Sequence, residues 1–433
     1  MRLKRQTFMR ALAITGALAA LAACDLDKVL QVQPANLIPA VDLEKPENAG
    51  LLLAGAAADF DCAVNSYIVV GALIGEELED ALQTADRWPY DQRNVTANLA
   101  RYAGNSCTAL GIYTPLQAAR VSANNIRRLM EGWTDVQVPN RQLMIARAAA
   151  YEGWAQLLLS ESFCEMVFSH VAGENVNWGT RITPDQARDS AIARFDQAIA
   201  AATAVGGTVA DSIRYFALIG RAKTYQDDGN MAAARADAAL VPLAFEWRIT
   251  NSNTNTRRQN RVFQESNPAV TQQSSSVGAY YRTLGDPRVP VQNMARNSSG
   301  TNVPQWAQLK YTAVNSPIPI ATGTEMRLLI AEADIGNGAG TTAATIAAMR
   351  TAGNQPAYTG TTDAEARAEI IDQRRRALWL TGTHLGDLIR YNMTLSPAAG
   401  AATPWGQTFG PSNGSALCLP LPVLEVQNNP LLN

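Results

Sequence analysis

Apolar residues three and four positions apart recur along much of this chain of 433 residues, and that spacing is the period of an α-helix. Many of the positions between them are alanine, the residue with the strongest preference for helices. We therefore expect a mainly α-helical fold. The predicted helices lie at 46–60, 63–83, 110–132, 137–166, 184–205, 208–228, 231–240, 324–335, 342–351 and 362–380.

The helix expected at 184–205 has clear sequence markers at both ends. Thr183 and Gln186 have the spacing of a capping box, and Pro184 occupies the first turn, where a missing N–H costs nothing. Gly206 and Gly207 then end the helix. These markers predict a helix of about six turns, because each turn takes about 3.6 residues.

The next two helices carry residues at the offsets used by tetratricopeptide repeats. These are a small residue, an aromatic residue, a turn glycine and a packing alanine, namely Ala222, Tyr225, Gly229 and Ala234. Together with the helix pair at 110–166, they favour a short bundle of tetratricopeptide-like helix pairs. A generic helical hairpin would explain the same four residues.

Polar residues replace the helical pattern between about 243 and 316. Long polar loops are usually either functional or disordered. This stretch contains Trp247, Tyr280, Tyr281 and Trp306, and disordered segments seldom carry so many aromatic residues. We therefore expect an irregular, loop-rich lobe at about 243–316, packed against helical repeats at about 46–242 and 317–395.

The N-terminal segment ends in a lipobox, Leu21-Ala22-Ala23-Cys24. Basic residues precede an apolar stretch at 11–21, which is too short to span a bilayer. We expect residues 1–23 to be a lipoprotein signal peptide, Cys24 to be lipidated, and residues 24–45 to be a tether. An ordinary secretory signal peptide is the alternative.

The composition excludes several classes of function. Four of the 36 cationic residues lie in the signal peptide, so the mature chain has a net charge of −6, which argues against nucleic acid as a partner. The two histidines, His170 and His384, have no metal-ligand spacing and stand in no catalytic motif. We expect no enzymatic activity, no cofactor and no metal ion. We also expect no later membrane span, the nearest apolar run being Ser66–Ile74.

Four cysteines follow the lipobox: Cys62, Cys107, Cys164 and Cys418. An even number outside the cytoplasm favours disulfides, and metal binding is the alternative. Four cysteines allow three pairings. We favour Cys62 with Cys107, because they bracket a single loop, and then Cys164 with Cys418, which would tie the C-terminal segment to the helical body.

Several further motifs follow one another along the chain. The first two are the short segments Ala146–Tyr151 and Gly285–Arg288. Pro317–Ala333 places an acidic residue before an apolar helix that ends in Ala-Glu-Ala, and Ile370–Arg390 is an arginine-rich helix followed by Gly-Asp-Leu-x-Arg. Leu419–Pro422 lies near the C-terminus. In their order and spacing, these motifs resemble the SusD/RagB family of outer-membrane nutrient-binding lipoproteins.

The resemblance implies a SusD-like fold, in which tetratricopeptide-like helix pairs pack against an irregular lobe, so that residues 46–433 form one SusD-like domain. It also implies a partner, a SusC-like TonB-dependent barrel that the lipoprotein covers as a lid. Family members bind glycans, and sometimes peptides, and break no bonds. A helical-repeat scaffold for protein interactions, anchored in the outer membrane, is the alternative; a surface hydrolase is a third interpretation.

The candidate binding residues are aromatic side chains that could stack on sugar rings and polar side chains that could bind hydroxyls. The loop at 83–94 supplies Trp88, Tyr90, Arg93 and Asn94, and the polar lobe supplies Tyr280, Tyr281 and Trp306. Each could instead be a packing residue.

Two tryptophans and one acidic run have structural explanations. Trp154 and Trp379 lie on apolar helical faces, so we expect them in the core. The acidic run Glu76–Asp80 lacks the pattern of a calcium loop, and we expect a solvated helix end there.

Overall fold

The computed structural model describes residues 40–99, 102–104, 107, 110–172, 175–271, 273–298, 301–337, 340–402 and 412–433. The expected signal peptide and the lipidation site at Cys24 lie outside this range. The chain divides into two units, Met1–Lys45 and Pro46–Asn433. The described part of the first unit contains the short helix α3 (Ala40–Leu43). Everything below concerns the second unit.

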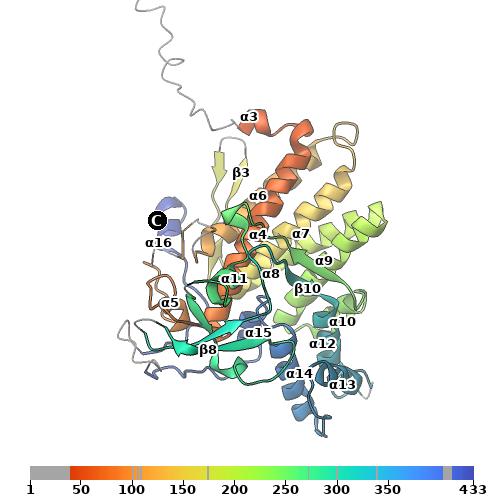
Figure 1. Cartoon of the computed structure of the whole chain (residues 1–433). Helices are drawn as coiled ribbons and strands as arrows, with labels where there is room; N and C mark the ends of the chain where they lie inside the picture. The colour runs from red at the N-terminus through yellow and green to blue at the C-terminus, as the bar shows by residue number, and fades with distance from the viewer. Residues whose placement is uncertain are drawn as a thin grey trace, which may run out of the picture. The chain divides into compact units, whose positions relative to one another are not determined.

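Long helices that pack in sequence order dominate the N-terminal half. They are α4 (Ala49–Ile74), α6 (Tyr113–Gly132), α7 (Arg141–Ser162), α8 (Pro184–Val205), α9 (Thr208–Asp227) and the shorter α10 (Met231–Ala238). Each contacts the next, and α4 also contacts α7. Figure 1 shows α4, α6, α7 and α9 side by side. The expected mainly α-helical fold is confirmed.

The series of packed helices continues after the lobe. Helix α10 contacts α12 (Gly323–Ala333), which packs on α13 (Thr341–Ala352) and α14 (Asp363–Ala377). The short helix α15 (His384–Arg390) returns to α4 and α7, and α16 (Val423–Asn428) lies near the C-terminus. Helices from the two halves of the sequence therefore share one body.

Close packing between α7, α8 and α9 depends on Phe195. A Cβ added to Gly220 would lie 2.3 Å from Phe195 Cζ, and one added to Gly153 would lie 2.8 Å from Phe195 Cε1. Real atoms do not approach so closely, so both positions need glycine for the ring to fit between the helices. The capping box expected for α8 is present, with Gln186 N donating to Thr183 Oγ1 at 3.3 Å.

The first long helix differs from the prediction. The two helices expected at 46–60 and 63–83 are one helix, α4, which ends at Ile74. The polar residue at the expected break, Asp61, is buried and accepts hydrogen bonds from Thr250 N at 3.3 Å and Thr250 Oγ1 at 2.8 Å. The sequence around position 61 does not reveal these partners from the lobe.

Residues Pro46–Ile74 are also long and apolar enough to cross a membrane, contrary to expectation. However, 83% of the most apolar window of this segment is buried inside the protein. Its apolar character is therefore explained by its place in the core, where helices are hydrophobic on all sides.

Short antiparallel strand pairs make up the remainder. β1 (Leu78–Asp80) pairs with β7 (Ser275–Val277), and β6 (Glu246–Ile249) pairs with β10 (Ile318–Thr322). Within the lobe, β8 (Val291–Asn297) pairs with β9 (Pro304–Gln308). Near the end of α7, β2 (Met166–Val167) pairs with β5 (Arg181–Ile182), and β3 (His170–Ala172) pairs with β4 (Asn175–Asn177). The lobe also contains α11 (Arg261–Ser266) and the 3₁₀ turn Ala279–Tyr281.

The disulfides have the pairing expected from the sequence. Cys62 is joined to Cys107, and Cys164 is joined to Cys418. Hydrogen bonds reinforce the second link, because Cys164 N donates to the carbonyl of Leu419 at 2.9 Å. The C-terminal segment is therefore fastened to the end of α7.

Candidate functional site

The loop after β1 contains the short helix α5 (Trp88–Asp91), with Pro89 in its first turn. Trp88 is half-buried at its start. The preceding residue, Arg87, holds this end of the loop, because Nε and Nη2 donate to the two carboxylate oxygens of Glu265 in α11 at 2.9 and 2.8 Å. Such two-bond pairs fix orientation as well as distance.

Two residues of this loop are packing residues, contrary to the prediction that they bind ligand. Tyr90 is 1% exposed, and its hydroxyl donates to the carbonyl of Leu110 at 2.8 Å. Arg93 is 2% exposed, donates from Nε to the carbonyl of Gly414 at 3.0 Å, and pairs with Glu76 at 3.2 Å. Burial lowers the pKa of the Arg93 guanidinium. Neither side chain is accessible to a ligand.

Arg93 and Asn94 together hold the segments on either side of residues 403–411. Arg93 also donates to the carbonyl of Pro397, while Asn94 Nδ2 donates to the carbonyl of Ser412 at 2.8 Å. The backbone of Gly414 donates to Gln92 O at 2.7 Å. This end of the expected site loop is thus an anchor for the C-terminal part of the chain, and Asn94 itself remains partly exposed.

Of the two lobe tyrosines, one is buried and the other is partly exposed. Tyr281 is fully buried and its ring stacks on Trp379, with centroids 5.9 Å apart, which contradicts the expected binding role. Tyr280 is half-buried. The guanidinium of Arg375 lies 3.7 Å from the Tyr280 ring centroid, and the Tyr280 hydroxyl donates to Asp372. One face of Tyr280 is therefore occupied by a cation.

Trp306 lies in β9, is half-buried, and packs partly against the core. Its backbone is fixed on both sides: N–H donates to Ser276 Oγ at 3.0 Å, and the carbonyl accepts from Ser266 Oγ at 3.4 Å. The neighbouring Glu265 also accepts from Ser275 Oγ at 3.1 Å. These bonds connect the Arg87 end of α5, through α11 and β7, to Trp306.

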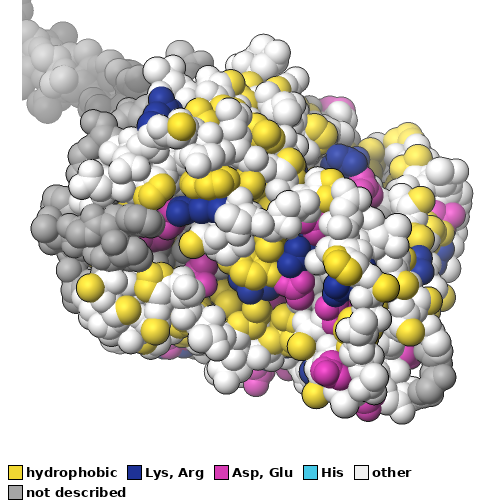
Figure 2. All heavy atoms as spheres, turned by 60° about the horizontal axis from the view of Figure 1, so that its bottom comes forward, with side chains coloured by type: hydrophobic (Ala, Val, Ile, Leu, Met, Phe, Trp, Pro, Cys, Tyr) yellow, Lys and Arg dark blue, Asp and Glu magenta, His cyan; other side chains and the backbone are white. Residues whose placement is uncertain are grey.

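Four of the predicted binding residues thus remain partly exposed, and we call them the candidate site residues: Trp88, Asn94, Tyr280 and Trp306. Figure 2 shows the face that includes the lower part of Figure 1, where β8 and α14 lie. Hydrophobic side chains gather in the middle of this face, with Lys, Arg, Asp and Glu side chains around them. Such a surface suits an amphipathic ligand.

The acidic run Glu76–Asp80 is not the solvated helix end that we expected. Glu77 and Asp80 are 1% and 0% exposed. Residues 78–80 pair with β7, and the Glu77 carboxylate accepts a hydrogen bond from Leu380 N. Burial raises the pKa of Glu77 to about 7 and that of Asp80 to about 6. No local sequence pattern marks these carboxylates as buried, since their partners come from distant segments.

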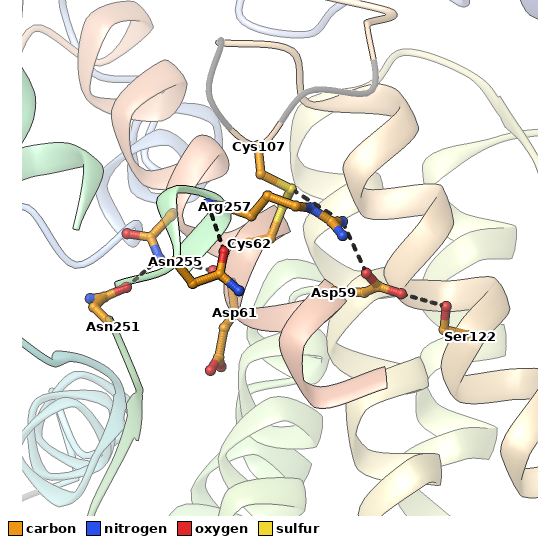
Figure 3. The surroundings of a disulfide bond; sticks show 9 residues. Asp59, Asp61, Cys62, Cys107, Ser122, Asn251, Asn255 and Arg257 are labelled. Carbon is orange, nitrogen blue, oxygen red and sulfur yellow. Dashed lines mark hydrogen bonds and ion pairs between the residues drawn. A yellow bond between two sulfur atoms is a disulfide. The ribbon is translucent and has the colours of Figure 1, made fainter. Parts of the chain in front are cut away.

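The disulfide Cys62–Cys107 braces the segment between α5 and α6. Figure 3 shows Arg257 beside it, with Nη2 lying 3.8 Å from Cys107 Sγ and 3.3 Å from Asp59 Oδ1. Asp59 also accepts from Ser122 Oγ at 2.7 Å, so the lobe is tied to α4 and α6 at this point.

A polar cavity of about 70 Å³ lies elsewhere, between α7, α8, α9 and α15. Glu161, Arg188, Asp227 and Arg390 line it, and Asp227 pairs with Arg390. At about 30 Å³ per water, it has room for about two waters rather than for a sugar. In the described part of the chain, no three His, Cys, Asp or Glu side chains converge as a metal site would require.

Comparison with known proteins gives no match to a family model and no match to a curated protein. Solved structures do match. A SusD superfamily protein from Bacteroides vulgatus ATCC 8482 superposes with a TM-score of 0.69 at 14% identity, over 89% of this chain and 97% of its own. Surface glycan-binding protein A from Bacteroides uniformis superposes with a TM-score of 0.66 at 16% identity, over 89% and 98%.

The chain has the SusD fold. A SusD-like carbohydrate binding protein from Bacteroides vulgatus ATCC 8482 gives a TM-score of 0.60 at 14% identity, over 84% of this chain and 86% of its own. The three matches cover 84–89% of this chain, so the shared fold includes most of it.

Proposed function

We propose that this protein is a surface-exposed, lipid-anchored outer-membrane protein that binds an oligosaccharide and delivers it to a SusC-like TonB-dependent barrel. The proposal rests on the SusD fold together with two half-buried indoles, those of Trp88 and Trp306. Hydrogen bonds through α11 and β7 connect the residue before Trp88 to the backbone of Trp306. Two proteins that share this fold are named for binding carbohydrate or glycan.

The candidate site residues have the chemistry that sugar binding needs. A pyranose ring has C–H faces that pack on an indole, and a rim of hydroxyls that bond to amides and charged groups. Trp88 and Trp306 supply aromatic faces, and Asn94 supplies an amide whose nitrogen is held by Ser412 O. The bonds of Arg87 and Ser276 hold the chain next to Trp88 and the backbone of Trp306, which lowers the cost of ordering these segments on binding.

The test uses full-length protein in detergent, titrated by calorimetry with cellohexaose, maltohexaose, xylohexaose, mannohexaose and a mixed peptide library. We expect at least one oligosaccharide to bind and to be recovered unchanged by mass spectrometry. Trp88→Ala and Trp306→Ala should each weaken binding about 5- to 30-fold, since a lost stacking face is worth about 1–2 kcal/mol.

Trp379→Ala is the matched control, because Trp379 is fully buried. It should lower the free energy of unfolding by about 3–5 kcal/mol through a core cavity, whereas the Trp88 change should leave stability nearly unaltered. Binding of peptides but no oligosaccharide would replace the proposed ligand class. Binding of neither would favour the scaffold alternative, and cleaved sugar would favour a hydrolase.

A further inference from the structure

We propose that Asn293 and Trp306 form one sugar subsite, in which Trp306 stacks on a pyranose ring and Asn293 Nδ2 donates to a ring hydroxyl. This inference rests on the proposed function and deepens it. It adds a polar residue of β8 to the candidate site residues.

Strand register places the two side chains together. Asn293 and Trp306 are directly opposite each other in the β8–β9 pair. Opposed residues project from the same face of a sheet, with Cβ atoms about 4.5–5.5 Å apart. The neighbouring pair, Gln292 and Ala307, projects from the other face, where Ala307 is fully buried. On β9, the face with Trp306 is the more open one, since Trp306 is half-buried and Ala307 is fully buried; on β8, Gln292 and Asn293 are both exposed.

A bulge next to Asn293 fixes the orientation of its amide. The pairing register shifts between Asn293 and Asn297, and within this bulge Ala295 has a φ of 51°, in the left-handed region. Ala295 N donates to Asn293 Oδ1 at 2.8 Å. Because Oδ1 accepts this bond, the amide nitrogen points elsewhere, and within the described residues Nδ2 has no hydrogen-bond partner.

The rest of the bulge is also held in place. Arg296 Nε donates to Oε1 of Gln305, a buried residue of β9, at 2.7 Å. The backbone of Trp306 is bonded to Ser276 and Ser266. An aromatic face and a single oriented donor are thus fixed before any ligand arrives, which lowers the entropic cost of binding. The ligand chemistry that fits is a pyranose with a hydroxyl oxygen as acceptor.

Asn293→Asp is the sharpest test. The carboxylate keeps the shape of the side chain and the acceptor for Ala295 N, but it replaces the donor with a charged acceptor. Gln292→Glu is the matched control, since it makes the same chemical change one residue away on the opposite face. Full-length protein in detergent is titrated with the same four hexaoses, and thermal unfolding is recorded for each variant.

We expect Asn293→Asp to weaken the binding of the hexaoses that bind the wild type at least about fivefold, and Gln292→Glu to change it less than about twofold. Asn293→Ser is the second variant, since its hydroxyl can still accept from Ala295 N without adding charge; it should weaken binding similarly. Unchanged affinity in Asn293→Ser overturns the subsite while leaving the proposed function intact. If the wild type binds no hexaose, the proposed function falls, and the subsite with it.

Discussion

Arg374 and Asp387 form a two-bond ion pair inside the protein, with Arg374 Nε donating to Oδ2 at 3.0 Å and Nη2 donating to Oδ1 at 2.9 Å. The two residues are 0% and 2% exposed. Burial alone would raise the pKa of Asp387, but Arg374 and Arg390 lower it below its usual value. Glu325, which binds Lys223 at 3.0 Å, lies 3.6 Å from the same guanidinium.

Removing one partner from this network should be strongly destabilising. Asp387→Ala leaves the buried Arg374 and the partly buried Arg390 without their shared carboxylate. A broken buried pair costs about 3–5 kcal/mol. The free energy of unfolding from urea titration measures the loss. Asp135→Ala is the control, because the pair of Asp135 with Arg141 is at the surface and should contribute less than about 1 kcal/mol. Equal effects of the two changes would contradict this view of the network.

This network explains why the sequence motifs predicted the fold well. Glu325, Arg374 and Asp387 belong to the segments that resemble the SusD/RagB family, and in the structure α12, α14 and α15 bring them together. The spacing of the motifs therefore reports how three helices pack. Capping residues such as Thr183 likewise act locally, and their helix ends were predicted correctly.

The candidate site was predicted less well, because burial depends on contacts that are distant in sequence. Tyr90 and Arg93 have residue types suited to a ligand, yet the carbonyls that bind them belong to Leu110, Pro397 and Gly414. A polar loop in the sequence does not indicate which of its side chains another segment will cover. We identified the additional residue, Asn293, from the register of β8 and β9, which the sequence does not show.

The anchoring role of Arg93 has a direct consequence. Arg93→Ala removes the bonds to Pro397 O and Gly414 O, so amide hydrogen exchange at 396–402 and 412–414 should accelerate by about tenfold or more. Sugar affinity should fall less than in Trp88→Ala, because Arg93 is buried. Asn94→Ala, which removes only the bond to Ser412 O, is the milder comparison. Exchange unchanged in Arg93→Ala would show that the segments are held by other contacts.

Lipidation at Cys24 is the basis of the proposed location. Cys24→Ala should move the protein from the outer membrane to the soluble envelope or secreted fraction, because acyl chains contribute about 0.8 kcal/mol per buried methylene. Fractionation followed by a salt wash and immunoblotting measures the shift. Cys62→Ala is the control for cysteine loss in general, and it should leave the protein in the membrane fraction. Retention of the Cys24 variant in the outer membrane after the wash would refute the anchor.

Glu77 should make stability depend on pH in a predictable sense. Its carboxylate accepts from Leu380 N at 2.8 Å, and burial raises its pKa from 4.5 to about 7 in the folded protein. The folded state therefore binds the proton more tightly than the unfolded state. The stabilising contribution is complete below pH 4.5 and is lost as the pH rises through 7, a change of about 3 kcal/mol.

The substitution Glu77→Gln removes this titration while its amide oxygen can still accept from Leu380 N. The variant should gain about 3 kcal/mol relative to the wild type between pH 4 and pH 8, measured as free energies of unfolding from urea titrations at several pH values. His384→Asn should change the free energy of unfolding with the opposite pH dependence. Burial lowers the pKa of His384 from 6.5 to about 4, so the stabilising contribution of the neutral imidazole is lost as the pH falls. A Glu77→Gln difference that stays constant with pH would mean that Glu77 has the same pKa in the folded and the unfolded protein.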